Sequence, residues 1–158
     1  LELLSTSEYL FRQLRLARTY FSVFNPVSDT PLENQPPENP IRQLRLYQSA
    51  FLLRDYGYTL EDLNFETGGF LPLGLDPKKA WAEQNLCNQP VEINKADRAQ
   101  LLRIPGIGPK TAAKVLAACR RNPIKELSDL QRIGVPLDKV VPYILLNGIK
   151  PVRQLSLW

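Results

Sequence analysis

Apolar residues recur at the three- and four-residue spacing of amphipathic helices along most of the chain. Before residue 91, this spacing and its end signals predict helices over residues 7–18, 40–56 and 77–85, the first one behind the capping-box pair Ser5 and Glu8. Residues 19–23 are aromatic and β-branched, so they predict either a short strand or the end of the first helix. Residues 29–40 hold four prolines among polar side chains and predict an extended surface crossing.

A turn rich in glycine and proline, residues 105–109, separates two further predicted helices over residues 95–103 and 109–121, the former with Asn94 as its cap. Gly106 and Gly108 can take positive φ and carry no Cβ, so we expect the backbone of this turn to lie directly against another molecule, with its N–H groups free to bind. Pro109 suits the first position of a helix, whose positive end would face the same point. Such a nest of N–H groups attracts phosphate. The simpler alternative is an ordinary helix–helix connection, because Gly-x-Gly with proline is common in turns.

The residues predicted to contact nucleic acid lie in or beside this turn and supply amides, a hydroxyl or positive charge. They are Gly106, Ile107, Gly108, Lys110, Thr111, Lys114 and Arg103. A related pattern returns over residues 132–141, shortened and with only Gly134 kept, and predicts a second, degenerate hairpin. The lost glycine and Asp138 both weaken anion binding, so we expect this second hairpin to be mainly structural, completing the core of the first.

Charge divides the chain. Residues 1–91 carry 8 Lys and Arg against 11 Asp and Glu, a net charge of −3, whereas residues 92–158 carry 12 against 5, a net charge of +7. We therefore expect a helical region over residues 1–90, a basic binding domain over residues 91–150 and a tail over residues 151–158. A run of charged residues is often only a solvated surface. For the positive charge of residues 92–158, however, attraction to a phosphate backbone is the simplest explanation.

Composition narrows the function classes. A hydrophobic fraction of 44% predicts a folded protein, and no apolar run approaches the roughly 18 residues of a membrane span. Without a leader resembling a signal peptide, we expect a cytoplasmic protein with no membrane partner. The two cysteines, Cys87 and Cys119, lack Cys-x-x-Cys spacing, and histidine is absent, which excludes a disulfide framework or an all-cysteine metal site and disfavours an ordinary hydrolase.

The second half resembles the tandem helix-hairpin-helix domains of bacterial DNA-uptake and repair proteins, over residues 91 to about 150. The motifs that carry the resemblance are Val91-Glu92-Ile93-Asn94-Lys95-Ala96 and Leu101-Leu102-Arg103-Ile104-Pro105-Gly106-Ile107-Gly108. The resemblance implies binding to the DNA backbone with little sequence preference. The expected fold is therefore mainly α, a tandem helix-hairpin-helix domain preceded by a small helical region with one short strand.

The first half is similar to the C-terminal part of DNA modification/repair radical SAM proteins that end in a helix-hairpin-helix domain. The segments that carry this likeness are Ser7-Glu8-Tyr9-Leu10-Phe11, Tyr20-Phe21-Ser22-Val23-Phe24-Asn25-Pro26-Val27, Arg45-Leu46-Tyr47-Gln48 and Leu75-Asp76-Pro77-Lys78-x-Ala80-Trp81. In that family an N-terminal barrel holds a 4Fe-4S cluster on a Cys-x-x-x-Cys-x-x-Cys loop and binds S-adenosylmethionine. This chain lacks the loop, so the resemblance implies a fragment that holds neither cofactor, is not catalytic alone and has the missing barrel as a partner.

Two other hypotheses for the function of the hairpins remain. The turn also resembles the hairpin of endonuclease III-type DNA glycosylases, in which Lys110 would be the nucleophile and Asp129 the accompanying carboxylate. Asp129 also stands where an ordinary helix-capping acid is expected. Paired hairpins of this kind occur in protein-docking modules as well.

Overall fold

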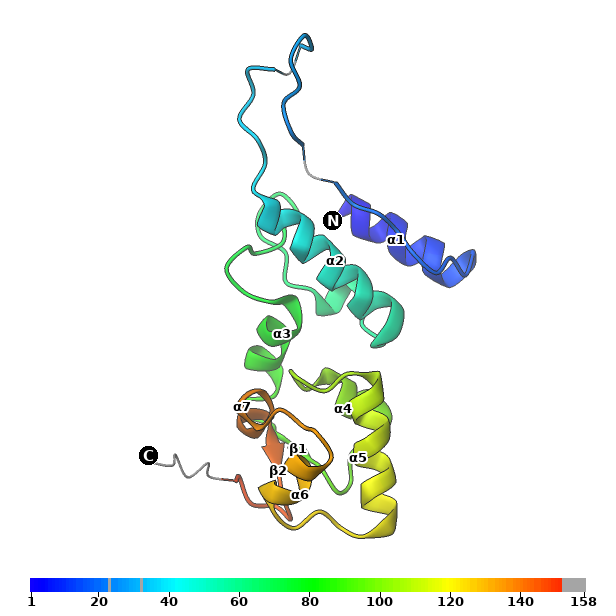
Figure 1. Ribbon diagram of the computed structural model, residues 1–158, viewed down its shortest axis with the longest axis vertical. Coiled ribbons are helices and arrows are strands. Elements are labelled where there is room, and N and C mark those ends of the chain that lie inside the picture. Colours follow the sequence, from blue (N-terminus) through cyan, green and yellow to red (C-terminus); the bar gives the residue numbers. More distant parts are fainter. Residues whose placement is uncertain (23, 32, 152–158) are drawn as a thin grey trace. The chain divides into compact units, whose positions relative to one another are not determined.

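The computed structural model describes residues 1–22, 24–31 and 33–151 and is mainly helical, as expected (Figure 1). The chain forms two compact units, Leu1–Pro77 and Lys78–Trp158. Val23, Leu32 and residues 152–158, most of the predicted tail, lie outside the described residues. The helices of the first unit are α1 (Glu2–Gln13) and α2 (Pro40–Asp55), with a 3-10 turn at Leu60–Asp62. Those that follow are α3 (Pro77–Asn85), α4 (Arg98–Arg103), α5 (Pro109–Arg121), α6 (Leu127–Arg132) and α7 (Leu137–Val140), with a 3-10 turn at Val141–Tyr143.

The first helix begins and ends five residues earlier than the capping signature predicts. Leu4 and Ser7 are buried within α1, and the Ser7 hydroxyl donates a hydrogen bond to the Leu3 carbonyl (2.8 Å), so this serine lies in the helix interior. The capping-box prediction at Ser5 is therefore wrong. Burial of Leu4 outweighs the local signal, and the chain leaves the helix by Arg15, which has φ +53°.

Helix α2 follows its local signals. The Asn39 side chain accepts the N–H of Ile41 (2.9 Å), Pro40 occupies the first turn, and Gly57 has φ +70° just beyond the helix. Residues 19–22 form neither a strand nor the end of α1, which stops at Gln13, so both predictions for this segment are wrong in its described part. Instead, the N–H of the buried Phe21 donates to the Tyr47 hydroxyl (3.1 Å), and the two rings meet edge to face. Side-chain bonds to α2 thus replace the ladder that a strand would need.

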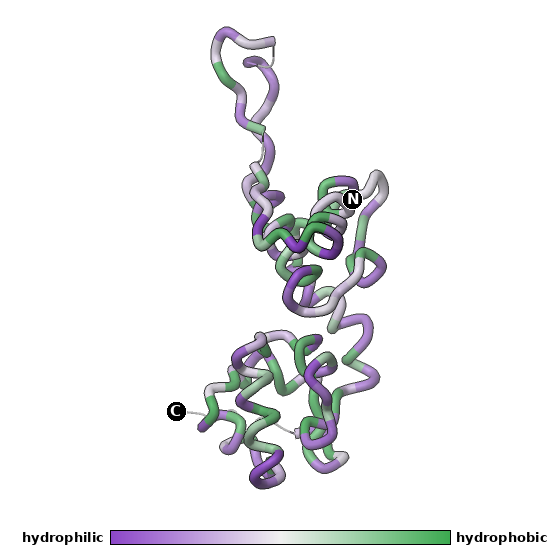
Figure 2. The backbone as a smooth tube through the Cα atoms, turned by 90° about the vertical axis from the view of Figure 1, so that its right-hand side faces the viewer, coloured by the Kyte–Doolittle hydropathy of each residue, from purple (hydrophilic) through white to green (hydrophobic). Residues whose placement is uncertain are grey.

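In its described residues, the predicted crossing over residues 29–40 is exposed, apart from the half-buried Glu38. The described residues of the 29–40 segment contain turns but no strand, and helix α2 begins only at Pro40. Figure 2 shows this crossing as largely hydrophilic, with hydrophobic stretches within the helical parts of each unit. No helix in the described parts of the chain combines the length and the apolar character that a membrane span requires.

The second unit is closed by a short parallel sheet. Strand β1 (Val91–Glu92) pairs with β2 (Ile144–Leu145), and the N–H of Ile93 donates to the Leu145 carbonyl (3.1 Å) (Figure 1). The pairing joins the segment before α4 to the segment after α7. Fully buried side chains from every part of the unit between these strands fill its core: Ile93, Leu101, Ile104, Ile107, Val115, Leu130, Val140 and Ile144.

Candidate nucleic-acid interface

The helix that enters the turn is shorter than predicted. Helix α4 begins at Arg98, because the Asp97 side chain accepts the N–H of Gln100 (2.8 Å) while the Gln100 side chain accepts the N–H of Asp97 (3.0 Å). Asn94 is not its cap. Its side chain accepts the N–H of Ile124 and donates to the Ile124 carbonyl, both at 2.8 Å, which ties β1 to the connection between α5 and α6.

Two buried isoleucines hold the turn between α4 and α5. Ile104 and Ile107 are fully buried, and the N–H of Ile107 donates to the Ile104 carbonyl (3.1 Å). Gly106 has φ +84°, whereas Gly108 is extended with φ −100°, so only Gly106 of the two uses the positive φ that glycine allows. Gly108 is instead the N-cap residue of α5, a position that takes extended dihedrals in any sequence.

Gly106 meets another part of the protein rather than open space. A Cβ added there would lie 2.8 Å from Pro136 Cγ and 3.0 Å from Lys139 Cβ, both closer than ordinary contact. The second hairpin therefore packs directly on the turn of the first. Glycine is required at this position by an intramolecular contact as well as by its dihedral angle.

The start of α5 offers several unused hydrogen-bond donors. Among the residues that the structure describes, the N–H groups of Gly106, Gly108, Lys110 and Thr111 have no acceptor, whereas the N–H of Ala112 donates to the Gly108 carbonyl (2.8 Å). Pro109 at the first helical position has no N–H. Lys110, on the first turn of the same helix, is exposed, and Thr111 is half-buried. Unused amides, the positive end of a helix and an ammonium group thus meet at one place.

This geometry agrees with a family match. Residues 90–118 match the family model of the helix-hairpin-helix motif. The motif indicates nucleic-acid binding. No curated protein and no solved structure is significantly similar to the chain.

Helix α3 supports the helix-hairpin-helix motif through two contacts that sequence analysis missed. Lys78 Nζ donates to the Ile107 carbonyl (2.6 Å), and the Arg103 guanidinium lies over the Trp81 ring, 4.7 Å from its centroid. The Lys78 ammonium therefore adds positive charge at the turn while it holds the backbone of the turn in place. The only local signal was the Asp76-Pro77 helix start, which predicts α3 but says nothing of a partner 29 residues further on.

The predicted contact residues separate into different settings. Gly106, Gly108, Lys110 and Thr111 gather at the turn and the first turn of α5. Lys114 lies one helical turn further along, and its Nζ is 3.9 Å from the point that a Cβ on Gly134 would occupy. Ile107 is fully buried, and both its N–H and its carbonyl are hydrogen-bonded within the protein, so this residue anchors the turn. The half-buried Arg103 stacks on α3.

The second hairpin repeats the shape of the first without its free amides. Gly134 also has φ +84°, and Val135 is buried as Ile107 is. However, the N–H of Gly134 donates to the Gln131 carbonyl (2.9 Å), and that of Val135 donates to the Leu130 carbonyl (3.1 Å). Pro136, which follows, has no N–H at all. The second turn therefore offers a phosphate fewer backbone donors than the first.

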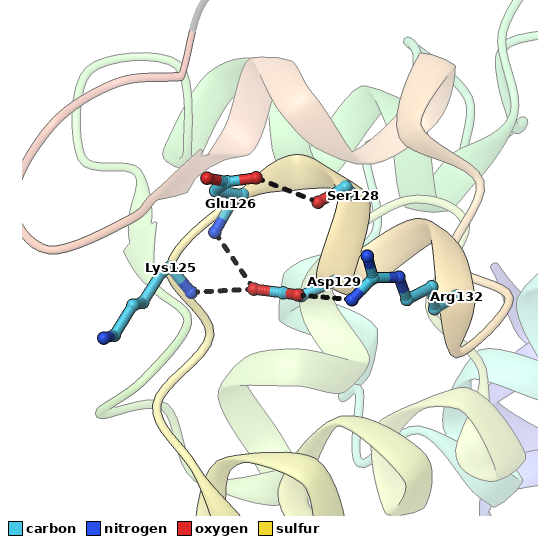
Figure 3. Close-up of polar contacts among 5 residues, drawn as sticks. All are labelled: Lys125, Glu126, Ser128, Asp129 and Arg132. Carbon is cyan, nitrogen blue, oxygen red and sulfur yellow. Dashed lines mark hydrogen bonds and ion pairs between the residues drawn. The ribbon is translucent and has the colours of Figure 1, made fainter.

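Asp129, the carboxylate that a glycosylase would need, is the third residue of α6 and forms a capping box with the N-cap residue Glu126 (Figure 3). Its carboxylate accepts the N–H groups of Lys125 (3.1 Å) and Glu126 (3.2 Å) and lies 3.4 Å from the Arg132 guanidinium. These two backbone N–H groups, with smaller help from the nearby positive charges, lower the pKa of Asp129. A charged carboxylate in this role agrees with the expectation that Asp129 is an ordinary helix-capping acid. Within the described ranges, no group of three or more His, Cys, Asp or Glu residues could hold a metal ion.

Proposed function

We propose that the second unit binds DNA through its phosphodiester backbone, with little preference for base sequence. The observation that carries this proposal is the set of four N–H groups without acceptors at Gly106, Gly108, Lys110 and Thr111, beside the exposed Lys110 ammonium. Backbone amides and a lysine at a helix start suit phosphate oxygens. Because such donors contact phosphate and not base edges, they position a strand without reading its sequence.

The proposed contact residues act in two ways. Gly106, Gly108, Lys110 and Thr111 donate to phosphate, and Lys114 extends the positive charge along α5. Ile107 and Arg103 hold the turn, the first by burial and the second by stacking on Trp81. We place these residues in a tandem helix-hairpin-helix domain over residues 91–150, in which the second hairpin supports the first.

We also propose that the chain is the DNA-targeting part of a radical SAM protein of DNA modification or repair, on the resemblance of its first unit. A 4Fe-4S cluster is held by cysteine thiolates in a closely spaced set. Cys87 and Cys119 are 32 positions apart and are the chain's two cysteines, so the residues present do not fit the cluster. The cluster and S-adenosylmethionine would belong to a barrel that this chain does not supply, and no step of chemistry is assigned to the chain itself.

The test is a fluorescence anisotropy titration of the full chain with a labelled duplex and a labelled single strand across a salt series. Each phosphate contact contributes a slope of about −0.9 in log affinity against log salt for duplex DNA. Lys110→Ala should therefore flatten the slope by about 0.9 and weaken binding about eightfold at 0.1 M salt. Arg120→Ala is the matched control, because Arg120 is an exposed cation on the same helix, turned about 80° away from Lys110.

Equal salt slopes for Lys110→Ala and the unchanged chain would show that the hairpin does not contact the DNA backbone. Covalent trapping by borohydride on an abasic-site duplex, lost in Lys110→Ala, would replace the proposal with a glycosylase. Absence of binding at low salt would leave the paired hairpins as a protein-docking module.

A further inference from the structure

A stripe of exposed residues runs along α5 from the hairpin turn to the end of the helix. Its members are four, seven and eleven positions beyond Lys110 and are all exposed: Lys114, Ala117 and Arg121. At 3.6 residues per turn these four positions lie within about 60° of the helix circumference. The stripe therefore carries three cations in a row, with a small residue between the second and the third.

A groove of about 470 Å³ lies beside the distal part of this stripe. The groove runs between α5 and the turn of the second hairpin, and the residues that line it are Lys114, Ala117, Ala118, Arg121, Arg132, Ile133 and Gly134. Three of these seven residues are cationic and none is acidic. Asp129 lies 3.4 Å from the Arg132 guanidinium, but the Arg132 side chain is 78% exposed, so this pair leaves Arg132 accessible.

The lining also leaves room for a close approach. Ala117, Ala118 and Gly134 have small or no side chains, and Lys114 Nζ lies beside Gly134, 3.9 Å from the point where a Cβ would be. A groove lined by cationic and small side chains suits a compact anion that carries two oxygens on one side, as a phosphodiester does.

We propose that this groove is a second phosphodiester-binding site, which holds a phosphate of the same DNA strand that the first hairpin grips. The proposal rests on the proposed function, because it extends the hairpin's contact along α5. In this arrangement the second hairpin contributes through the Arg132 side chain, which lines the groove, instead of through the backbone amides that its turn uses internally.

The length of α5 sets the reach of the contact. Lys110 and Arg121 are eleven residues apart, which corresponds to about 16 Å along the helix axis. Duplex DNA rises about 3.4 Å per nucleotide along its axis, and each strand also winds around that axis, so successive phosphates lie further apart than the rise. The two sites are therefore fewer than about five nucleotides apart on one strand, and a ligand that reaches both must span about 16 Å.

The test compares two double variants of the full chain in the anisotropy titration. Arg121→Gln with Arg132→Gln removes two cations of the groove, whereas Arg120→Gln with Lys125→Gln removes two exposed cations that do not line it. We expect the groove variant to flatten the salt slope by about 0.9 and to weaken binding about eightfold at 0.1 M salt. The control variant should change the slope by much less, and thermal unfolding should show both to be folded.

A second measurement uses labelled single strands of increasing length. The unchanged chain should gain affinity when the strand becomes long enough to span about 16 Å, and the groove variant should lose this gain while keeping the affinity for shorter strands. Equal effects of the two double variants would overturn the proposal, because the cations would then act only through net charge. A normal slope in the groove variant together with a flattened slope in Lys110→Ala would also overturn it, while leaving the proposed function in place. If no variant loses affinity, both this proposal and the proposed function are overturned.

Discussion

Substitution of Gly106 by alanine tests whether the second hairpin packs on the first as the structure describes. Two costs add at this position. An L-residue at φ +84° is destabilised by about 1–2 kcal/mol. The added Cβ would also lie 2.8 Å from Pro136 Cγ and 3.0 Å from Lys139 Cβ, and such overpacking costs about 1–3 kcal/mol. We expect Gly106→Ala to lower the free energy of unfolding of the second unit by about 2–5 kcal/mol.

Gly134→Ala is the matched control, because Gly134 has the same φ of +84° in the equivalent turn. The added Cβ would meet only Lys114 Nζ at 3.9 Å, the end of a flexible side chain at ordinary contact distance. Its cost should therefore be the dihedral strain alone, about 1–2 kcal/mol. The difference between the two variants isolates the contact with the second hairpin.

The assay is urea unfolding followed by tryptophan fluorescence, since residues 1–77 contain no tryptophan and Trp81 lies in α3 of the second unit. Thermal unfolding should give the same order, with about 4–8 °C lost per kcal/mol for a unit of this size. Pro136→Ala in the Gly106→Ala background should recover part of the loss, as a favourable coupling energy in a double-mutant cycle. Equal destabilisation by Gly106→Ala and Gly134→Ala, with no coupling to Pro136, would refute the packing of the two turns.

Three further predictions follow from other contacts of the second unit. Asn94→Ala should cost about 1–3 kcal/mol in urea unfolding, because it leaves both backbone groups of Ile124 without their partner, whereas Asn122→Ala at an exposed site should cost far less. Because the pKa of Asp129 is lowered in the folded protein, its contribution to stability is complete above the ordinary Asp range and is lost as pH falls through the folded pKa. Asp129→Asn should therefore reduce the loss of stability at acid pH, measured as the free energy of unfolding against pH. An unchanged loss at acid pH would contradict the capping role. Burial raises the pKa of the Cys119 thiol, so iodoacetamide at pH 8 should label the exposed Cys87 first. In the Cys87→Ser variant, mass spectrometry should show that Cys119 is labelled mainly when the protein unfolds.

Local signals predicted the elements whose ends depend on neighbouring residues. Helix α5 runs from Pro109 to Arg121 as predicted, because proline favours a first turn and Asn122-Pro123 prevents its continuation. The cap of α2 at Asn39 and the positive φ of Gly57 are confirmed for the same reason. The prediction failed at α1, where the burial of Leu4 overrides a capping signature, and at residues 19–22, where Tyr47 takes up the N–H of Phe21.

The sequence predicted the centre of the candidate site in the same way, since Gly106, Lys110 and Thr111 are close in sequence and one turn of chain brings them together. It did not predict the contacts between distant segments. Lys78 at the Ile107 carbonyl, Pro136 against Gly106 and the groove between α5 and Gly134 each join residues about 20–30 positions apart. Residue types along a chain specify turns and helix ends through short-range hydrogen bonds and dihedral preferences. Which faces then meet depends on how the buried isoleucines, leucines and valines pack together, and that packing places a second basic surface beside the hairpin.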